Sequence, residues 1–425
     1  MSEWADRLLA DVCVTIRAGG TPQADNQNFY GGETPFVTIE DISSIGRTIE
    51  TTARALTTAG LNASAAWLVP SDHLLYSMYA TLGKVTRNKV SVATNQAILA
   101  IKPDEKLIAC DLLFYLLQFK ESSVASLSSQ TTQANLSADK VRKFKLRFPV
   151  SLLEQRRIAE ILSTLDEAIE QTEALIAKHQ QIKAGLMHDL FTRGVTPDGH
   201  LRPTRGQAPD LYKESMLGWI PMEWEVKPLR DLTIKIADRD HTTPEYVDDG
   251  VIMVSPTNLF DDEGIDFAAC RNIPLRDHLI NRRKTDIESG DLILHRIGAG
   301  LGDVRLVTDD MPEFSILHSM ALVRPLRSAV SAEYLLWSFR SYPVLLQMDI
   351  GTQSIGVPDL GLDKIGSLLF PVAPHGEQTI IANSLRTQAE AGGAERSCLV
   401  KLRQQKHGLM HDLLTGRVRV PMTEQ

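Results

Sequence analysis

The 425-residue chain has few cysteines: only Cys13, Cys110, Cys270 and Cys398, scattered singly. This spacing argues against a disulfide framework and against a zinc site built from paired cysteines. The sequence contains no run of about 18 uncharged apolar residues, so we expect no membrane span. The first residues lack a basic region followed by an apolar core, so no secretory signal is expected. A reducing cytoplasm is the expected compartment.

The chain also lacks the excess of positive charge that is common in nucleic-acid-binding domains. Its 45 basic and 53 acidic residues give a formal net charge of −8. The local field matters more than this total. Cations alternate with apolar residues from Lys143 onward, so a strand there would have one basic face that includes Lys143 and Lys145. A solvated charged face is the simpler interpretation, and DNA contact is the alternative.

Motifs for covalent chemistry are missing as well. The sequence has no Walker A loop, no Asn-Pro-Pro-aromatic methylation motif and no convincing cluster of nuclease carboxylates. Gly298–Gly302 is glycine-rich, but a strand pattern rather than a helix follows it, which favours a flexible turn over a phosphate or S-adenosylmethionine loop. His188-Asp189 and His411-Asp412 lie at expected helix ends, which favours packing or docking over metal chemistry. We therefore expect no catalytic residue, no metal and no cofactor on this chain.

The sequence does contain one pattern twice. Gly-Leu-Met-His-Asp-Leu at Gly185–Leu190 returns at Gly408–Leu413, an offset of 411 − 188 = 223 residues. Phe148-Pro149-Val150 returns as Phe370-Pro371-Val372, an offset of 370 − 148 = 222. This period is too long for a solenoid repeat and indicates a duplicated domain with pseudo-two-fold symmetry. Such symmetry suits a nearly two-fold ligand such as duplex DNA.

Each copy combines a globule with a long helix. The globule reads as short strands and turns with a short helix, whereas the helical part of the first copy, from Ser151 to Phe191, has no proline and only one glycine. The predicted fold class is therefore α+β, with two pseudo-two-fold-related mixed α/β domains joined by a pair of long antiparallel helices. The expected segments are a globule at 1–150, a helix at 151–192, a polar linker at 193–217, a globule at 218–372, a helix at 373–416 and a tail at 417–425.

The first long helix has a heptad seam of mainly apolar residues. So long a helix cannot bury its apolar stripe on itself, so we expect it to pair antiparallel with its copy. Gly392-Gly393 predicts a break or kink in the second helix, because two glycines cost about 1 kcal/mol each relative to alanine. The seam is expected to shift to Ile381 and Leu385 before it. The residues expected to pair the helices are Ile161, Leu165, Leu175, Ile182, Leu186, Leu385, Leu402 and Leu409.

Together these features resemble the specificity subunits of type I restriction-modification enzymes. The resemblance is carried by Ala18–Pro22, Pro35–Ile42, the two Phe-Pro-Val…Glu-Gln helix starts, Gly218–Val226 and His407–Val418. It covers essentially the whole chain, in the family's order of recognition domain, helix, recognition domain, helix. The resemblance implies that each target-recognition domain reads one half of a split DNA sequence. It also implies that the helices set the gap between the halves.

The resemblance implies partners too. These are double-stranded DNA, two modification subunits that methylate adenine N6 with S-adenosylmethionine, and two restriction subunits that use ATP and Mg, all in a bacterial or archaeal cytoplasm. Because the helices keep similar ends while the globules have diverged, the two half-sites should differ. A self-sufficient DNA methyltransferase or nuclease with unrecognised motifs is one alternative. A structural coiled-coil adaptor that never touches DNA is another.

Polar residues on turns where the two copies align are the candidate DNA contacts. Thr21 and Gln23, for example, follow a double glycine that allows the backbone to approach phosphate closely. An ordinary solvated turn is the alternative for every candidate. The candidates in the first copy are Thr21, Gln23, Thr38, Glu40, Asp41, Tyr79, Lys84, Arg87, Gln130, Thr131, Thr132, Gln133, Lys143 and Lys145. Those in the second copy are Arg239, His241, Thr242, Ser255, Thr257, Asn258, Arg296, Arg305, Thr352, Gln353 and Ser354.

Overall fold

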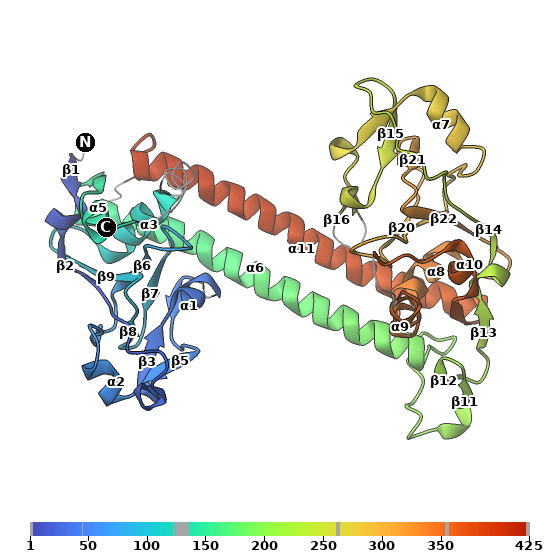
Figure 1. Ribbon diagram of the computed structural model, residues 1–425, viewed down its shortest axis with the longest axis horizontal. Helices are drawn as coiled ribbons and strands as arrows, with labels where there is room; N and C mark the ends of the chain where they lie inside the picture. Colours follow the sequence, from blue (N-terminus) through green and yellow to red (C-terminus); the bar gives the residue numbers. More distant parts are fainter. Residues whose placement is uncertain are drawn as a thin grey trace. The chain divides into compact units, whose positions relative to one another are not determined.

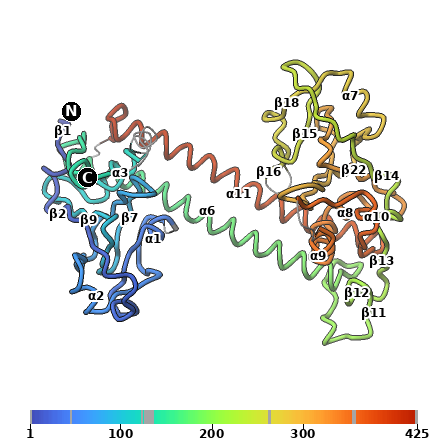
Figure 2. The backbone as a smooth tube through the Cα atoms, in the orientation of Figure 1, coloured from blue at the N-terminus to red at the C-terminus, as the bar shows by residue number. Residues whose placement is uncertain are grey.

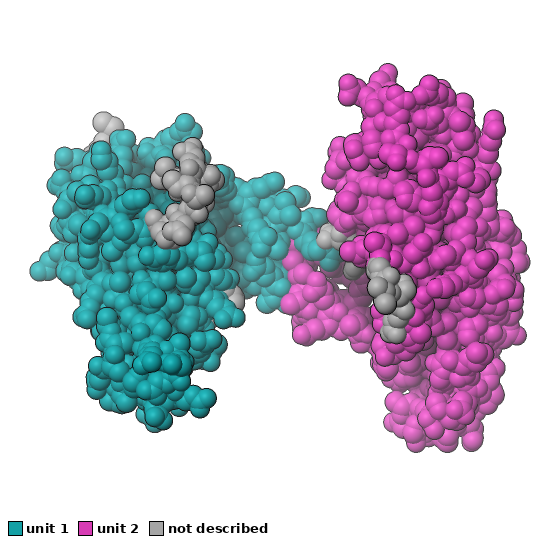
Figure 3. Space-filling view, viewed as in Figure 1, with its two compact units in different colours: residues 1–174, 396–425 teal, residues 175–395 magenta. Residues whose placement is uncertain are grey.

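The chain divides into two compact units. The computed structural model describes residues 3–44, 46–121, 124, 136–260, 264–352 and 357–421. Unit 1 comprises residues 1–174 and 396–425, and unit 2 comprises residues 175–395 (Figure 3). Each unit holds one globular part and a portion of both long helices, α6 (Leu152–Thr192) and α11 (His375–Thr415). Among the described residues, no helix combines the length and apolar character needed to span a bilayer.

Unit 1 is built around a five-stranded sheet of order β2-β9-β6-β7-β4 (Figure 1). The central strands β6 and β9 are buried almost throughout, which explains why their sequences are continuously apolar rather than alternating. The elements of its globule are β1 (Trp4–Leu8), β2 (Cys13–Ala18), β3 (Tyr30–Val37), α1 (Ile39–Ser44), β4 (Thr48–Ile49), β5 (Arg54–Leu56), α2 (Thr58–Asn62), β6 (Leu74–Ser77), β7 (Val85–Asn88), β8 (Ala93–Thr94), β9 (Ile98–Pro103), α3 (Cys110–Phe119), α5 (Ala138–Arg142) and β10 (Lys145–Pro149).

Unit 2 repeats this topology. Its sheet of order β14-β22-β19-β20 corresponds to β2-β9-β6-β7, and the backbone can be followed in Figure 2. The elements of its globule are β11 (Tyr212–Ser215), β12 (Gly218–Pro221), β13 (Glu225–Pro228), β14 (Thr233–Ala237), β15 (Val251–Val254), β16 (Leu259–Phe260), β17 (Gly264–Ile265), β18 (Arg271–Ile273), α7 (Leu275–Asn281), β19 (Leu292–His295), β20 (Val304–Leu306), β21 (Phe314–Ile316), β22 (Met320–Pro325), α8 (Ala332–Phe339), α9 (Tyr342–Gly351), α10 (Leu362–Ser367) and β23 (Leu369–Val372).

The strand pairings show the duplication residue by residue. Arg17 pairs with Ala100 between β2 and β9, and Ala237 pairs with Leu322 between β14 and β22. β3 pairs antiparallel with β5 and parallel with β8, and β15 makes the same two kinds of pair with β18 and β21. The internal duplication inferred from the sequence is therefore a duplication of fold.

The repeated Glu-Gln dipeptide connects each globule to its own long helix. In unit 1, Gln155 accepts from Ala109 N at 2.7 Å and donates to Leu107 O and Pro149 O. In unit 2, Gln378 accepts from Ser331 N at 2.9 Å and donates to Ala329 O and Ala373 O. Both carboxamides are buried, so each bond is shielded from water and costly to leave unmade.

The two long helices pair antiparallel within each unit, as expected. In unit 1, Asp166 of α6 contacts Lys406 of α11 at 2.5 Å, and Glu173 of α6 contacts Arg403 of α11 at 2.6 Å. The residue numbers of the contacts increase along α6 and decrease along α11, so the two helices run in opposite directions. In unit 2, His179 of α6 is hydrogen-bonded to Gln388 of α11. Leu190 and Phe191 of α6 also share a buried cluster with Ile381, Ala382, Leu385 and Ala389 of α11.

The predicted break at Gly392-Gly393 is wrong, because α11 is helical from His375 to Thr415. Gly392 is buried, and tertiary packing supplies most of the stability of a helix in a protein, so it outweighs low intrinsic propensity. The shift of the seam to Ile381 and Leu385 is confirmed, since both side chains are fully buried.

The seam predicted on α6 is wrong at two positions of its second half. Leu175 is 38% exposed and Ile182 is 45% exposed, whereas the neighbouring Ile176 and Lys183 are half-buried. His179 of the same seam is half-buried and hydrogen-bonded to Gln388, so the departure is local to these two positions. Ile161, Leu165, Leu186, Leu402 and Leu409 are half-buried, and Leu385 is fully buried.

Gly185 and Gly408 occupy the same position of the repeated segment in α6 and α11. A Cβ built on either glycine meets no atom within 4 Å. Replacing each by alanine should therefore raise the free energy of unfolding by about 1 kcal/mol in urea denaturation. Gly194→Ala is the control and should destabilise, because Gly194 has φ +64° and its Cβ would meet Glu377, Arg202 and Trp224. A loss of stability in both helix variants would contradict the interpretation.

Candidate nucleic-acid interface

Some of the candidate residues, among them Thr21 and His241, follow strands at one equivalent end of the central sheet in each unit. In unit 1, Met78 follows β6, its N–H donates to Ala97 O at 2.8 Å, and its carbonyl accepts from Leu136 N at 3.2 Å. In unit 2, Arg296 follows β19 and makes the same pair of bonds, with Ser319 O at 2.9 Å and Leu360 N at 2.9 Å. We call these two places the strand-end surfaces. Gln130, Thr131, Thr132, Gln133, Gln353 and Ser354 lie outside the described residues.

The double glycine of unit 1 is explained by packing inside the unit. A Cβ on Gly19 would lie 1.9 Å from Thr94 O, and one on Gly20 would lie 2.6 Å from the backbone of Ala65. Close packing within unit 1 therefore explains both glycines, and no approach of a phosphate is needed to account for them. Thr21 and Gln23 beyond them are exposed, and the Thr21 hydroxyl donates to the carboxamide of Gln96.

Gln96 and its counterpart His318 are polar residues that the sequence analysis missed. Each lies two positions before the matching strand, β9 or β22. Aligning those two strands would have identified them, since both precede a run of buried apolar residues. Gln96 is exposed and His318 is half-buried.

Asp41 and Asn258 are equivalent buried residues that stabilise a turn. The Asp41 carboxylate accepts from Thr38 N at 2.7 Å, from Thr38 Oγ1 at 2.8 Å and from Ala53 N at 3.1 Å. The Asn258 carboxamide oxygen accepts from Ser255 N at 2.9 Å and Ser255 Oγ at 2.7 Å. Asp41 is 4% exposed and Asn258 is 6% exposed, so these bonds give both a structural role.

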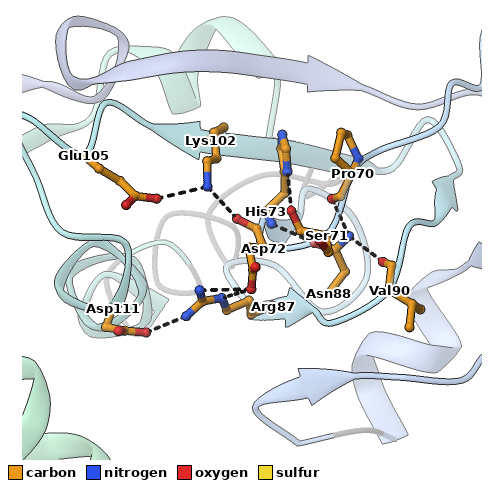
Figure 4. Close-up of polar contacts among 10 residues, drawn as sticks. All are labelled: Pro70, Ser71, Asp72, His73, Arg87, Asn88, Val90, Lys102, Glu105 and Asp111. Atoms are coloured by element: carbon orange, nitrogen blue, oxygen red, sulfur yellow. Dashed lines mark hydrogen bonds and ion pairs between the residues drawn. The ribbon is translucent and has the colours of Figure 1, made fainter.

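Arg87 lies in a network of polar contacts (Figure 4). Its guanidinium contacts Asp72 at 3.0 Å and Asp111 at 2.9 Å, which connects β7 to the first turn of α3. Next to it, Asn88 donates to Pro70 O and Val90 O and accepts from His73 N. The ion pairs of Arg87 and the hydrogen bonds of Asn88 connect separate segments of unit 1, so Arg87 has a structural role in the fold.

Arg305 is a buried arginine on β20 of unit 2, at the position equivalent to Thr86 on β7. It is 2% exposed, and its guanidinium donates to Gly264 O at 3.1 Å and Val304 O at 3.0 Å. A guanidinium committed to backbone carbonyls in the interior stabilises the loop that it contacts rather than presenting donors to a ligand.

The remaining candidates of unit 1 differ in exposure. Lys145 is exposed on β10, where it alternates with the buried Leu146 as the sequence pattern predicted, whereas Lys143 lies before the strand at the end of α5. Exposed side chains in this group are Glu40, Tyr79, Lys143 and Lys145. Thr38 and Lys84 are half-buried, and the Lys84 ammonium donates to Ser43 O at 3.4 Å.

In unit 2, Arg239 stabilises the turn at 238–242. It is 5% exposed, and its Nη2 donates to Thr242 O at 3.0 Å and Thr242 Oγ1 at 2.7 Å. Burial lowers the pKa of Arg239. Thr242 and Thr257 are exposed, whereas Ser255 and Thr352 are half-buried. The Thr352 hydroxyl donates to Met348 O at the end of α9.

Arg296 joins three segments of the strand-end surface of unit 2. Its side chain is 4% exposed and contacts Asp238 at 2.5 Å and Asp359 at 2.8 Å. Its Nη2 also lies 3.1 Å from Nε2 of His241. The ring of His241 packs against that of His318, with centroids 4.9 Å apart. Unit 2 thus carries charged groups where unit 1 carries Met78 and Gln96.

One set of side chains has the composition of a catalytic triad. His278 lies 3.0 Å from Ser315 Oγ and 3.1 Å from Glu313 Oε1. Ser315 is 2% exposed within β21, and Asn281 donates to its hydroxyl at 3.4 Å. The hydroxyl is therefore closed to a substrate, and the set holds α7 on β21.

Two further observations bear on chemistry. Among the residues that the structure describes, no group of three or more His, Cys, Asp or Glu side chains could hold a metal ion. Burial raises the pKa of the Cys13 thiol to about 12 and that of Cys110 to about 11, so neither is a thiolate nucleophile at neutral pH.

Known proteins with this organisation point to one family. The family model for the type I restriction modification DNA specificity domain matches residues 1–180. The type I restriction enzyme MjaVIII specificity subunit of Methanocaldococcus jannaschii is 25% identical over 361 residues, which is 82% of this chain and 80% of that one. Residues 1–180 thus match the family's DNA specificity domain, and the chain is similar to type I specificity subunits over most of its length.

Other known proteins show the same similarity. The HindI specificity subunit of Haemophilus influenzae is 28% identical over 176 residues, 39% of this chain and 37% of that one. The crystal structure of the S subunit from M. genitalium has the same fold, with a TM-score of 0.60 and 13% identity over 99% of this chain and 97% of that one. A structure from a study of complex assembly and conformational transition in the type I R-M system gives a TM-score of 0.54 with 16% identity, covering 98% of each chain.

The family model covers the first globule and most of α6, and the fold duplication extends the family's features to the second half. Unit 2 repeats the sheet order, the Gln378 connection and the strand-end surface. The family domain is therefore present twice in fold, with different side chains at the two strand-end surfaces.

Proposed function

We propose that this chain is the sequence-specific DNA-binding subunit of a type I restriction-modification complex. The observation that supports this proposal is the duplicated specificity fold, in which each unit has the same strand-end surface with exposed polar residues. Polar side chains on turns can contact both phosphates and base edges. Unit 1 carries the exposed Thr21 and Gln96 there, whereas unit 2 carries the exposed His241 beside the half-buried His318 and the buried Arg296. Each unit therefore reads one half of an asymmetric bipartite site.

The helices and the partners complete this proposal. Paired helices α6 and α11 keep the gap between half-sites constant and dock two modification subunits, which transfer a methyl group from S-adenosylmethionine to adenine N6. Two restriction subunits use ATP and Mg for translocation and cleavage. The chain itself catalyses no reaction and works with DNA in a bacterial or archaeal cytoplasm. The relatives' names as specificity subunits support this division of labour.

Deleting the gene should abolish adenine methylation at one bipartite, asymmetric motif in the host genome. Methylome sequencing of the wild-type, deleted and complemented strains measures this directly. The full chain with its modification subunits should then bind a duplex carrying the motif at least about 10³-fold more tightly than a scrambled duplex at fixed salt.

Other outcomes would contradict the proposal and favour a different function. Binding of S-adenosylmethionine by the isolated chain in titration calorimetry would favour a self-sufficient methyltransferase. A complete absence of gel shift at low salt, with modification subunits added, would favour a structural adaptor.

A further inference from the structure

The contact with Arg296 selects one tautomer of the neutral His241 ring. Nε2 of His241 lies 3.1 Å from Nη2 of Arg296. The Asp238 carboxylate lies farther from the same Nε2, at 3.5 Å. A guanidinium has only donors, so Nε2 accepts the shorter hydrogen bond, from Arg296, through its lone pair. The ring proton of His241 is therefore on Nδ1, because the bond made by one imidazole nitrogen determines the state of the other.

Arg296 is itself held in one orientation. Its two terminal nitrogens contact Asp359 at 2.8 Å and Asp238 at 2.5 Å, and only 4% of the side chain is exposed. Charge-assisted hydrogen bonds of this kind are short and geometrically specific. The donor that faces His241 Nε2 is thus fixed from two sides, by the turn after β14 and by the segment before α10.

His318 supports the other side of the ring. The two imidazole planes are tilted by 34° with centroids 4.9 Å apart. Burial lowers the pKa of His318, and the nearby His241, Arg239 and Arg296 lower it further. His318 therefore packs as a neutral ring. The imidazole of His241 is positioned by Arg296 and His318, while 59% of its own side chain is exposed.

Unit 1 has no equivalent of this arrangement. By the register of the matching strands, Thr21 corresponds to His241, Met78 to Arg296 and Gln96 to His318. None of these three residues carries a charge or an imidazole. A positioned, exposed imidazole N–H is thus a property of the second strand-end surface alone.

We propose that His241 is a specificity-determining residue that donates its Nδ1–H to guanine in the half-site read by unit 2. This rests on the proposed function. Guanine presents two neighbouring acceptors, N7 and O6, in the major groove, whereas cytosine presents an amino donor there. A fixed N–H therefore favours guanine and opposes cytosine at the same position. A phosphate oxygen would accept the same hydrogen bond without selecting a base.

The experiment uses the full chain with its modification subunits and a duplex carrying the motif found by methylome sequencing. Each base pair of the half-site assigned to unit 2 is changed in turn, and each guanine is replaced by 7-deazaguanine. For the wild type, one guanine position should show a loss of affinity of about tenfold or more. His241→Ala should abolish the discrimination at that position and leave the other half-site unaffected.

Two variants separate recognition from folding. His241→Asn keeps an N–H donor close to the place of Nδ1 and should retain part of the discrimination. His200→Ala is the matched control, since His200 is 82% exposed in the segment after α6, and it should behave as the wild type. In histidine-labelled wild-type protein, ¹⁵N NMR should show His241 protonated at Nδ1.

Three results would overturn the proposal. Full discrimination by His241→Ala at every position would exclude a specificity role. An equal loss of affinity for all duplexes, scrambled ones included, would assign the contact to phosphate. Protonation at Nε2 would remove the positioned donor. Failure of the proposed function is distinguishable, because the wild type would then show no preference for the motif.

Discussion

Arg202→Met should lower the free energy of unfolding of unit 2 by about 3–5 kcal/mol, because it leaves a buried carboxylate without its cation. Arg202 contacts Glu377 through both terminal nitrogens, at 2.5 and 3.0 Å. The two side chains are 9% and 7% exposed. Glu377 also accepts from Val195 N at 2.7 Å, so it joins the segment after α6 to the first turn of α11.

Unit 1 supplies the matched control for this substitution. Glu173 of α6 contacts Arg403 of α11 at 2.6 Å, and the two side chains are 45% and 61% exposed. Water screens two exposed charges, so Arg403→Met should cost no more than about 1 kcal/mol. Urea denaturation measures both variants, and hydrogen exchange at 193–202 and 375–381 locates the change. Equal effects of the two substitutions would contradict the role assigned to the buried pair.

The architecture could be predicted from the sequence where the signal is periodic or repeated. The repeated Gly-Leu-Met-His-Asp-Leu segment predicted two matching long helices, and the alternation at Lys145–Phe148 predicted strand β10. Antiparallel pairing followed because neither helix could bury its stripe alone. The seam failed at Leu175 and Ile182, although Leu186 farther along the same seam is half-buried.

The candidate site was less predictable, because a polar residue on a turn has the same local sequence whether it faces water or the interior. Arg87 pairs with Asp111, 24 residues away, and Arg305 donates to Gly264 O, 41 residues away. Such partners are set by tertiary packing, which no local pattern encodes. His241 was predicted as a DNA contact, but its positioning by Arg296 and His318 required the structure.

Replacing residues 1–150 by the globule of another family member should change one half of the methylated motif completely and leave the other half unchanged. The gap between the halves should also stay the same, because α6 and α11 are untouched. The physical reason is that each globule has its own connection to the helices, through Gln155 in unit 1 and Gln378 in unit 2. A junction at residue 150 keeps both glutamines in place.

The choice of donor globule follows from one buried contact. Tyr115 of α3 donates to Asp166 of α6 at 2.7 Å, and Asp166 also pairs with Lys406 of α11. A donor with tyrosine at the position of Tyr115 should fold normally, whereas one with phenylalanine leaves one hydrogen bond of a buried carboxylate unmade and should be less stable by about 1–3 kcal/mol.

Methylome sequencing of the hybrid measures the exchange. Replacing residues 218–372 instead is the matched control and should change only the complementary half of the motif. A change in both halves, or in the gap, after either replacement would show that the two globules do not read DNA independently. A hybrid with phenylalanine at the position of Tyr115 can be compared with the same hybrid in which that residue is changed to tyrosine. If the first is unstable and the second supports methylation of the new motif, the hydrogen bond to Asp166 limits which globules can be joined to this helix pair.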